Sequence, residues 1–535
     1  MLDPKISNNK INRAILDKII AERFTNIKDV TQIKLWACRE FGLNKFPRNS
    51  EILAVATDDE KEKVLKFLKL KPVRSISGVY IITVMPKPYP CPKNEPCIYC
   101  PGGPDFGTPQ SYTGKEPAGR RAIEHGFNPY QQVKSRIEQF RLMGHNVDKV
   151  ELIIFGGTLT AYPQKYLEWF VTQCLNAMSG ADAKTIEEAQ TAAENASIKN
   201  SDITIETRPD YCKESHIDLM LRLGITRVEL GVQTVYDDIY KLVNREHTIE
   251  DVIQATRLAK DAGFSVIYHM MPGLIGSNYE RDLKAFEIIL HDERFKPDAI
   301  KIYPTLIMPG TKLYQMWKRG EYKPYSFDKI VELIVEVKKL MPRWMRIQRI
   351  QRDIPSNLIA EGVKRGDLRL LVQKELKKEG AHCQCIRCRE VGHVQYKSKC
   401  EPNARDVKLI INKYKASEGE ELFLSFEDIK KDVLIGLLRL RYPSEKANRP
   451  EAKNVRSMLV RELHIYGPLV QVGSKADTNE WQHRGWGEHL MQEAEKISKE
   501  EFDAKKIIVL AGIGTRNYYR RFGYEREGPY MVKKI

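Results

Sequence analysis

Short apolar runs alternate with amphipathic stretches over the middle of the chain, from about residue 78 to residue 341. The apolar runs cover residues 79–84, 150–155, 203–207, 227–231, 265–269 and 299–303, and helical patterns lie between them. Strands that alternate with helices in this way are typical of parallel βα units. The pattern therefore predicts an α/β fold whose central part, residues 76–341, is a partial (β/α) barrel.

The two ends of the chain have different patterns. Residues 1–75 carry a helical apolar stripe with lysines and arginines on the other faces, which predicts a basic helical region. The stripe consists of Ile15, Ile19, Ile20, Phe24 and Ile27. From about residue 407, apolar runs at 407–413, 422–426, 433–441 and 457–465 precede a helical stretch at 486–502 and a run at 506–511. This order predicts a mixed α+β domain over residues 405–535.

Two further segments are less regular. Residues 181–201 are rich in Ala, Glu and Thr with few large apolar residues, so we expect an exposed helical insertion there. Residues 342–404 read as a basic linker, in which Arg343, Arg346, Arg349 and Arg352 recur at every third position, close to one face of a helix. These arginines and the N-terminal helices are candidates for phosphate contacts, the alternative being ordinary solvated surfaces.

Composition narrows the class of partner. Lysine and arginine number 87 against 71 aspartate and glutamate, a net charge of +16. This excess favours an anionic partner, most simply a nucleic acid, although a generally basic enzyme would show it too. The ten cysteines are clustered, which indicates a reducing compartment and metal binding. The charged N-terminus lacks the apolar core of a secretory signal, and we expect a cytoplasmic protein.

Three cysteines share one short loop directly after the first predicted strand. Cys91, Cys97 and Cys100 can hold three corners of an iron–sulfur cube and leave its fourth iron without a protein ligand. A structural zinc site or free thiols are the alternatives, and the third cysteine and the barrel context favour the cluster. The next strand ends in Gly156, Gly157 and Thr158, a turn whose backbone could receive the amino group of a cofactor.

A second motif opens the helix predicted at 486–502. The sequence from Gln482 to Gly487 contains Gly485 and leads into Trp486, Gly487 and Glu488. Free N–H groups at a helix N-terminus favour a diphosphate, so this loop is an anion-binding candidate.

A second cysteine group lies in the linker, at Cys383, Cys385 and Cys388. We expect a structural zinc there, with a fourth ligand from His382, His393 or Cys400. A second iron–sulfur cluster is the alternative.

The cysteine loop resembles that of the radical S-adenosylmethionine (SAM) superfamily, although its first gap has five residues where that family commonly has three. The resemblance implies a [4Fe-4S] cluster on Cys91, Cys97 and Cys100 whose open iron binds SAM, which is then cleaved to a deoxyadenosyl radical. It implies that Gly156, Gly157 and Thr158 contact the SAM amino group. Polar residues at later strand ends are expected in the same pocket, namely Glu206, Arg208, Glu229 and Gln233.

Residues 405–535 resemble the GNAT acetyltransferase fold. This likeness implies that acetyl-CoA pairs with the backbone of the strand before the loop, at Glu462, Leu463, His464 and Ile465, and that its diphosphate lies at Gly485, Trp486, Gly487 and Glu488. It places Tyr519, with Tyr518 as second choice, near the CoA sulfur. A half-buried core tyrosine is the alternative for Tyr519. Glu462 is either a general base or a rim carboxylate.

The whole chain resembles the catalytic-subunit family of Elongator, in the stand-alone form of archaea. The resemblance rests on GGPDFGTPQSYTGKEP, RVELGVQTVYDDIY, HMMPGLIG and GTRNYYRRFGY. It implies a tRNA wobble-uridine carboxymethylating enzyme, in which a SAM-derived radical activates the methyl of acetyl-CoA for addition to uridine C5 and thioester hydrolysis gives 5-carboxymethyluridine. It also implies that Lys149 contacts acetyl-CoA.

The partners implied are the tRNA anticodon stem-loop and an electron-donor protein, with the chain acting alone or as a homodimer. Eukaryotic relatives act in a multi-subunit complex. The alternatives are a protein-lysine acetyltransferase with a SAM-binding scaffold, supported by the GNAT likeness alone, and a non-catalytic tRNA-binding module.

Overall fold

The computed structural model describes residues 8–22, 27–43, 45–453, 455–468 and 481–535. The chain divides into two compact units, residues 1–75 with 134–148 and residues 76–133 with 149–535. Phe24 of the predicted N-terminal stripe lies outside the described residues. No helix in the described part of the chain is long and apolar enough to cross a membrane.

The first unit is helical, as predicted. Its helices are α1 (Asn8–Ala21), α2 (Ile27–Glu40), α3 (Asn49–Ala54) and α4 (Asp58–Leu68). Ile15 and Ile19 of the predicted stripe are buried in their common core. Thr57 caps α4 by accepting a hydrogen bond from the backbone N–H of Glu60. His145 Nε2 lies 2.7 Å from Leu70 O and ties residues 134–148 into this unit.

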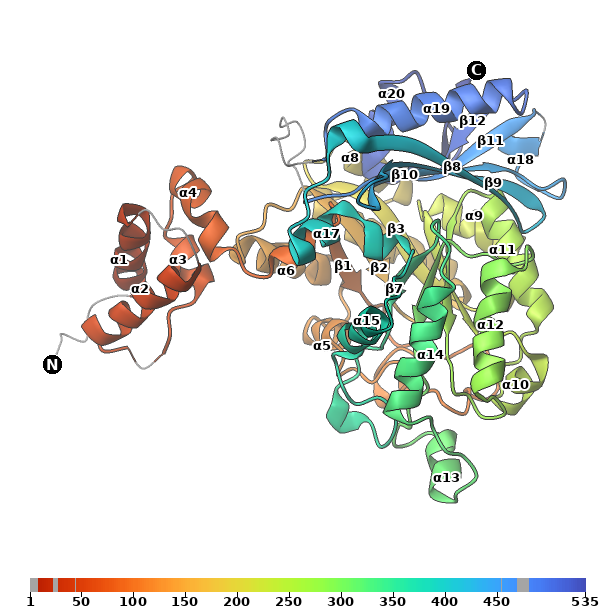
Figure 1. Cartoon of the computed structure of the whole chain (residues 1–535), viewed down its shortest axis with the longest axis horizontal. Coiled ribbons are helices and arrows are strands. Elements are labelled where there is room, and N and C mark those ends of the chain that lie inside the picture. Colours follow the sequence, from red (N-terminus) through yellow and green to blue (C-terminus); the bar gives the residue numbers. More distant parts are fainter. Residues whose placement is uncertain (1–7, 23–26, 44, 454, 469–480) are drawn as a thin grey trace. The chain divides into compact units, whose positions relative to one another are not determined.

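The second unit contains a seven-stranded sheet whose strands follow one another in chain order and pair in parallel (Figure 1). They are β1 (Tyr80–Val84), β2 (Lys149–Ile154), β3 (Lys199–Thr207), β4 (Arg227–Gln233), β5 (Ser265–Met270), β6 (Ala299–Ile302) and β7 (Arg346–Arg349). Strands β5 and β6 are buried along their whole length, which explains why they read as unbroken apolar runs. The predicted α/β half-barrel is confirmed.

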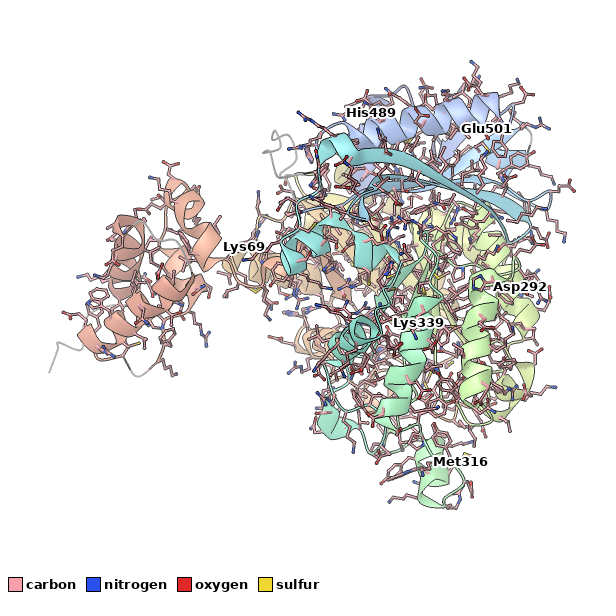
Figure 2. The ribbon with its side chains drawn as sticks, viewed as in Figure 1. Lys69, Asp292, Met316, Lys339, His489 and Glu501 are labelled. Atoms are coloured by element: carbon pink, nitrogen blue, oxygen red, sulfur yellow. The ribbon has the colours of Figure 1, made fainter. Side chains whose placement is uncertain are left out.

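Helices follow most strands of this sheet. They are α5 (Pro117–Glu124), α6 (Pro129–Leu142), α7 (Gln164–Ser179), α8 (Ile186–Asn195), α9 (Glu214–Arg222), α10 (Asp237–Leu242), α11 (Ile249–Asp261), α12 (Tyr279–His291), α13 (Lys312–Lys318) and α14 (Phe327–Lys339). The outer side chains pair their charges locally. Lys339 lies 2.6 Å from Glu336, and Asp292 lies 2.6 Å from Arg294 (Figure 2).

A second sheet has the order β13-β14-β12-β11-β10-β9-β8. Its strands are β8 (Val407–Ala416), β9 (Gly419–Asp428), β10 (Val433–Tyr442), β11 (Ser457–Ile465), β12 (Lys506–Val509), β13 (Glu525–Glu527) and β14 (Tyr530–Lys534). Only the β11–β12 pair is parallel among the described strands of this sheet. Helix α19 (Trp486–Glu500) packs on it through Leu490, Met491, Ala494 and Ile497. The predicted mixed domain is confirmed.

Short helices complete the unit. They are α15 (Leu368–Lys378), α16 (Ile386–Arg389), α17 (Val391–Ser398), α18 (Pro450–Lys453) and α20 (Arg516–Arg520).

Two expectations about local structure are wrong. The arginines at 343–352 do not form a helical face, because residues 346–349 are strand β7, hydrogen-bonded to β6. The segment 181–201 is not an exposed insertion either. Its helix α8 buries Ile186, Ala189 and Ala193, and Glu194 accepts a 2.9 Å hydrogen bond from Arg516.

The two sheets meet at the edge where the parallel strands begin. Asp298, directly before β6, forms a bidentate ion pair with Arg461 of β11 at 2.8 Å. Asp261, at the end of α11, lies 2.7 Å from Arg441 of β10. Arg461 and Arg441 side chains are wholly buried. The second sheet therefore packs against the amino ends of the barrel strands, opposite to the loops that follow their carboxyl ends.

Candidate functional site

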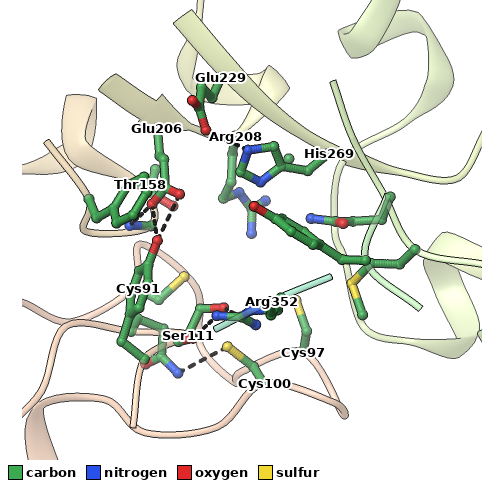
Figure 3. A pocket seen from close by; sticks show the side chains of 18 of the residues that line it. Cys91, Cys97, Cys100, Ser111, Thr158, Glu206, Arg208, Glu229, His269 and Arg352 are labelled. Atoms are coloured by element: carbon green, nitrogen blue, oxygen red, sulfur yellow. Dashed lines mark hydrogen bonds and ion pairs between the residues drawn. The ribbon is translucent and has the colours of Figure 1, made fainter. Parts of the chain in front are cut away.

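The three clustered cysteines line one pocket at the carboxyl ends of the barrel strands (Figure 3). Their loop is fastened to the barrel through Ile98, whose N–H donates to Val243 O at 3.2 Å and whose carbonyl accepts from Leu313 N at 2.8 Å. The pocket also holds Glu206, Arg208, Glu229 and Gln233, all expected there from their strand ends. These strand ends meet because parallel strands present their carboxyl ends at one edge.

Positive charge surrounds the buried Cys97. Arg245 Nη1 lies 3.7 Å and Lys93 Nζ 3.4 Å from its sulfur. Burial alone would raise the pKa of the Cys97 thiol, but these two cations lower it below its ordinary value. Burial raises the pKa of Cys100 to about 11, although Gln110 Nε2 donates to its sulfur at 3.3 Å. A thiolate at Cys97 is the form that ligates iron, so the donor set suits a cluster.

The glycine turn after β2 faces a carboxylate. Gly156 and Gly157 donate their N–H groups to Glu206 Oε2 at 3.2 and 3.3 Å, and the Tyr112 hydroxyl donates to the same carboxylate at 2.7 Å. Gly157 has a φ of 77°, which favours glycine. Gly157 and Thr158 line the pocket, and Glu206, labelled with Thr158 in Figure 3, occupies the N–H groups of the turn.

The far wall of the pocket carries a buried charged triad. His269 Nε2 lies 2.7 Å from Glu229, and Lys301 is ion-paired with the same carboxylate. Burial would raise the pKa of Glu229, but the Lys301 charge lowers it to about 2. Sequence reasoning missed Arg245, His269 and Tyr303 as residues of this pocket, and it gave Arg352 only as a candidate for phosphate contacts. His269 and Tyr303 could have been found, because both lie where a strand ends, as Glu206 does.

The glycine loop lies at the other edge of the barrel. Gly485 has a φ of 83° and precedes α19, whose first turn holds Trp486, Gly487 and Glu488. Lys149, the first residue of β2, places its Nζ 3.1 Å from His483 Nε2 and 3.3 Å from Gln482 Oε1. Lys149 is thus brought next to this loop from more than 330 residues away.

The predicted acetyl-CoA contacts on strand β11 already form hydrogen bonds or ion pairs within the protein, which the sequence does not indicate. Glu462 accepts a 2.8 Å hydrogen bond from Arg439 and lies 3.7 Å from Arg227. Burial would raise the pKa of Glu462, but these arginines lower it, which makes this carboxylate a weak base. His464 Nε2 lies 2.8 Å from Ser77 O. The Ile465 carbonyl accepts from Gln482 at 3.0 Å, and Leu463 is partly buried against the core.

The two candidate tyrosines differ in position. Tyr519 is 6% exposed and belongs to the apolar core under α19. A Cβ on Gly487 would lie 2.7 Å from the Tyr518 hydroxyl, so Tyr518 is the one beside the glycine loop.

The linker cysteines also come together. The sulfurs of Cys383, Cys385 and Cys388 all lie within 4.8 Å of one another. Lys338 Nζ lies 3.5 Å from the Cys388 sulfur. Of the proposed fourth ligands, His393 is engaged by Glu390 at 3.0 Å. Three sulfurs at this separation can ligate one zinc ion.

Three family models match parts of this chain. The Radical SAM superfamily matches residues 90–288, the Radical_SAM C-terminal domain residues 297–378, and the ELP3 N-terminal domain residues 9–76. A tRNA uridine(34) acetyltransferase of Methanocaldococcus jannaschii is 49% identical over 98% of both chains. Elongator complex protein 3 of Homo sapiens is 44% identical over 95% of this chain and 93% of its own.

A solved structure is similar throughout its length. It is the archaeal Methanocaldococcus infernus Elp3 with an N-terminal deletion, which shares 47% of its sequence and matches with a TM-score of 0.76. The match covers 86% of this chain and all of that one. The identity over nearly the full length, together with the cysteine pocket, shows that the chain belongs to the Elongator complex protein 3 family of radical SAM proteins.

Proposed function

We propose that this chain modifies uridine 34 of tRNA and converts it to 5-carboxymethyluridine. The observation that carries the proposal is the cysteine pocket, in which cations lower the pKa of Cys97. The same compact unit contains the glycine loop of the mixed domain, which Lys149 of the parallel sheet contacts. The relatives named tRNA uridine(34) acetyltransferase support the substrate.

Cys91, Cys97 and Cys100 would hold a [4Fe-4S] cluster, and the pocket beside them would hold SAM. When bound, cluster and SAM supply a radical that takes a hydrogen atom from the methyl of acetyl-CoA. This chemistry is needed only if an unactivated methyl must bond to carbon C5 of the base. An ordinary acetyl transfer reacts at the carbonyl carbon and needs no radical.

The chain's own residues bind and orient. Arg245 and Lys93 lower the pKa of the Cys97 thiol and so favour its thiolate form, and Glu206 holds the glycine turn in place. The α19 N-terminus and Lys149 supply positive charge for the diphosphate of acetyl-CoA. Because two arginines hold Glu462, we assign it to positioning β11. We assign Tyr518, in preference to Tyr519, as the tyrosine nearest the thioester.

Zinc at Cys383, Cys385 and Cys388 completes the proposed cofactors. Such a site would clip the linker between the two sheets. An electron-donor protein would reduce the cluster, and the clustered cysteines favour a cytoplasmic location.

An anaerobic assay tests the proposal. Reconstituted protein with dithionite, SAM, acetyl-CoA and tRNA should yield 5′-deoxyadenosine and 5-carboxymethyluridine, and Cys97→Ala should lose both products. Cys38→Ala changes a cysteine of the helical unit that is not among the lining residues of the pocket, so it is the matched control and should keep both. Unchanged nucleoside product from Cys97→Ala would falsify the radical chemistry. Acetylation of a lysine peptide by both proteins, without tRNA product, would support the acetyltransferase alternative instead.

A further inference from the structure

A second groove opens beside the cysteine pocket, along β7 and the segment that follows it. Its lining includes five basic side chains and one acidic one, namely Arg349, Arg352, Lys364, Arg369, Arg387 and Asp353. Asp353 is already ion-paired with Arg349. The groove therefore presents a surplus of positive charge.

The groove and the cysteine pocket share one wall. Arg349, Arg352 and Asp353 line both of them. Arg352 is held in this wall because it donates to the backbone oxygen of Ser111, another residue of the cysteine pocket. A molecule that reaches into the pocket is consequently adjacent to the groove.

Two guanidinium groups of the groove have donors without acceptors. Arg369 donates through Nη2 to Ile347 O at 3.2 Å, but its Nη1 is buried without a hydrogen-bond partner among the described residues. The same holds for Nε of Arg387 within the described part of the chain. An anion that accepts from both groups would satisfy these unpaired donors.

The arginines just before the groove differ from those that line it, because carboxylates already neutralise their charge. Arg343 is paired with Glu427 and Asp432, and Arg346 is paired with Glu390. Neither arginine is therefore available to neutralise a bound anion. The linker cysteines have a cation of their own in Lys338. Arg369 and Arg387 interact with the linker cysteines as well, but Nη1 of Arg369 and Nε of Arg387 still lack an acceptor among the described residues.

We propose that this groove binds a phosphodiester of the RNA strand whose uridine enters the cysteine pocket. The inference rests on the proposed function, because it takes the substrate to be an RNA loop. A base splayed into a pocket leaves its backbone at the mouth, and guanidinium groups bind phosphate oxygens in pairs. The shared wall at Arg349 and Arg352 lets one nucleotide occupy both spaces.

Binding of an anticodon stem-loop to the full-length protein, measured by fluorescence anisotropy at several salt concentrations, tests this site. Arg369→Gln and Lys364→Gln should each weaken binding about four- to sixfold at 0.15 M salt and reduce the salt slope by about 0.7–0.9, the value of one phosphate contact. Lys364 is exposed, so its substitution leaves folding intact. Arg369→Lys keeps the charge but not the paired donors, so it should keep the salt slope of the parent protein while binding more weakly than it.

Arg365→Gln is the matched control. Arg365 is exposed, pairs with Asp367 and does not line the groove, so its loss should change neither affinity nor slope. A stem-loop with a neutral methylphosphonate beside uridine 34 should bind the parent protein more weakly. The same change should cost Arg369→Gln much less, because that contact is already lost.

Three outcomes separate the possibilities. Normal stem-loop affinity and slope in Arg369→Gln and Lys364→Gln would overturn the inference and leave the proposed function standing. Weaker binding of acetyl-CoA or SAM alone by these variants, with normal RNA binding, would reassign the groove to a cofactor anion. Failure of the parent protein to bind any stem-loop would instead contradict the proposed function.

Discussion

Glu229 is a buried carboxylate whose charged form is stabilised chiefly by Lys301. Its side chain is 1% exposed, pairs with Lys301 and accepts a hydrogen bond from His269 Nε2 at 2.7 Å. Removing one member of a buried pair leaves an uncompensated charge, at a cost of about 3–5 kcal/mol. The carboxylate therefore keeps its charge in the pocket only while Lys301 is present.

Lys301→Met should lower the free energy of unfolding by about 3–5 kcal/mol at pH 7. In the parent protein the pKa of Glu229 is depressed to about 2, so the stability it contributes exists above its unfolded value and is lost as pH falls. In Lys301→Met burial raises that pKa, so protonation relieves the penalty as pH falls. Denaturant unfolding at both pH values should show that the difference in free energy of unfolding between the parent protein and Lys301→Met is smaller at pH 5 than at pH 7.

Two further variants check this explanation. Glu229→Gln in the Lys301→Met background should recover part of the loss. Lys312→Met, which breaks the exposed pair with Glu95, should leave the unfolding midpoint unchanged. A gap that widens toward pH 5 would show that another group causes the loss.

At the scale of elements, the tight turn Ile513–Thr515 packs directly on β3. A Cβ on Gly512, just before this turn, would lie 1.8 Å from the backbone oxygen of Ser201. The φ of Gly512 is −56°, so the close approach rather than the backbone conformation requires glycine. Glycine at this position lets the second sheet approach the amino end of the barrel strand.

Gly512→Ala should destabilise the protein by roughly 1–3 kcal/mol, since backbone atoms on both sides must shift. Gly366→Ala is the matched control, because a Cβ there meets nothing within 4 Å and its φ is ordinary. It should be neutral or stabilising by about 0.4–1 kcal/mol. Thermal unfolding of both variants measures the difference, and equal midpoints would contradict the packing argument.

Strand β7 and helix α8 show where local patterns mislead. Arginine at every third position suits a helix, yet Arg346–Arg349 forms a strand because β6 offers an open edge to it. The Ala-rich α8 has Ile186 as its one large apolar residue, but Arg516 and Asn517 of α20 donate hydrogen bonds to its Glu194. Both outcomes depend on partners distant in the chain, which no periodicity records.

At the scale of the molecule, a layer of buried charges joins the two sheets. Arg461 lies 2.8 Å from Asp298 and 2.7 Å from Glu421, and all three side chains are at most 3% exposed. Lys260 and Arg441 reach the same Glu421 at 3.5 and 3.0 Å. This layer makes the stability of the barrel and of the mixed sheet interdependent.

Arg461→Met should therefore cost about 3–5 kcal/mol, because two carboxylates lose a shared partner. Arg319→Gln, which removes an exposed pair with Glu321, should leave the midpoint unchanged. Denaturant unfolding followed by circular dichroism and by tryptophan fluorescence checks both the loss and the coupling. Retention of the parent midpoint in Arg461→Met would show that the layer does not hold the sheets together.

The layer also fixes where the two candidate sites lie. The glycine loop contacts Lys149 at the amino end of β2, whereas the cysteine pocket includes Gly157 just past its carboxyl end. A strand rises about 3.3 Å per residue, so roughly 15–25 Å of barrel separates these edges. In the proposed reaction, an acetyl-CoA whose diphosphate lies at the glycine loop would have to extend or move across this distance to bring its acetyl group to the cysteine pocket.

The sequence alone was enough to determine the parallel βα units, the cysteine triad, the glycine loop and the family. Each of these depends on periodicity, spacing or contiguous motifs, which are properties of short stretches of the chain. Only the tertiary structure decided that Arg346–Arg349 is a strand, that two arginines hold Glu462, that Tyr518 rather than Tyr519 lies by the loop, and that the sites occupy opposite edges. These features arise from contacts between residues up to 334 positions apart, where ion pairing and burial outweigh local preference.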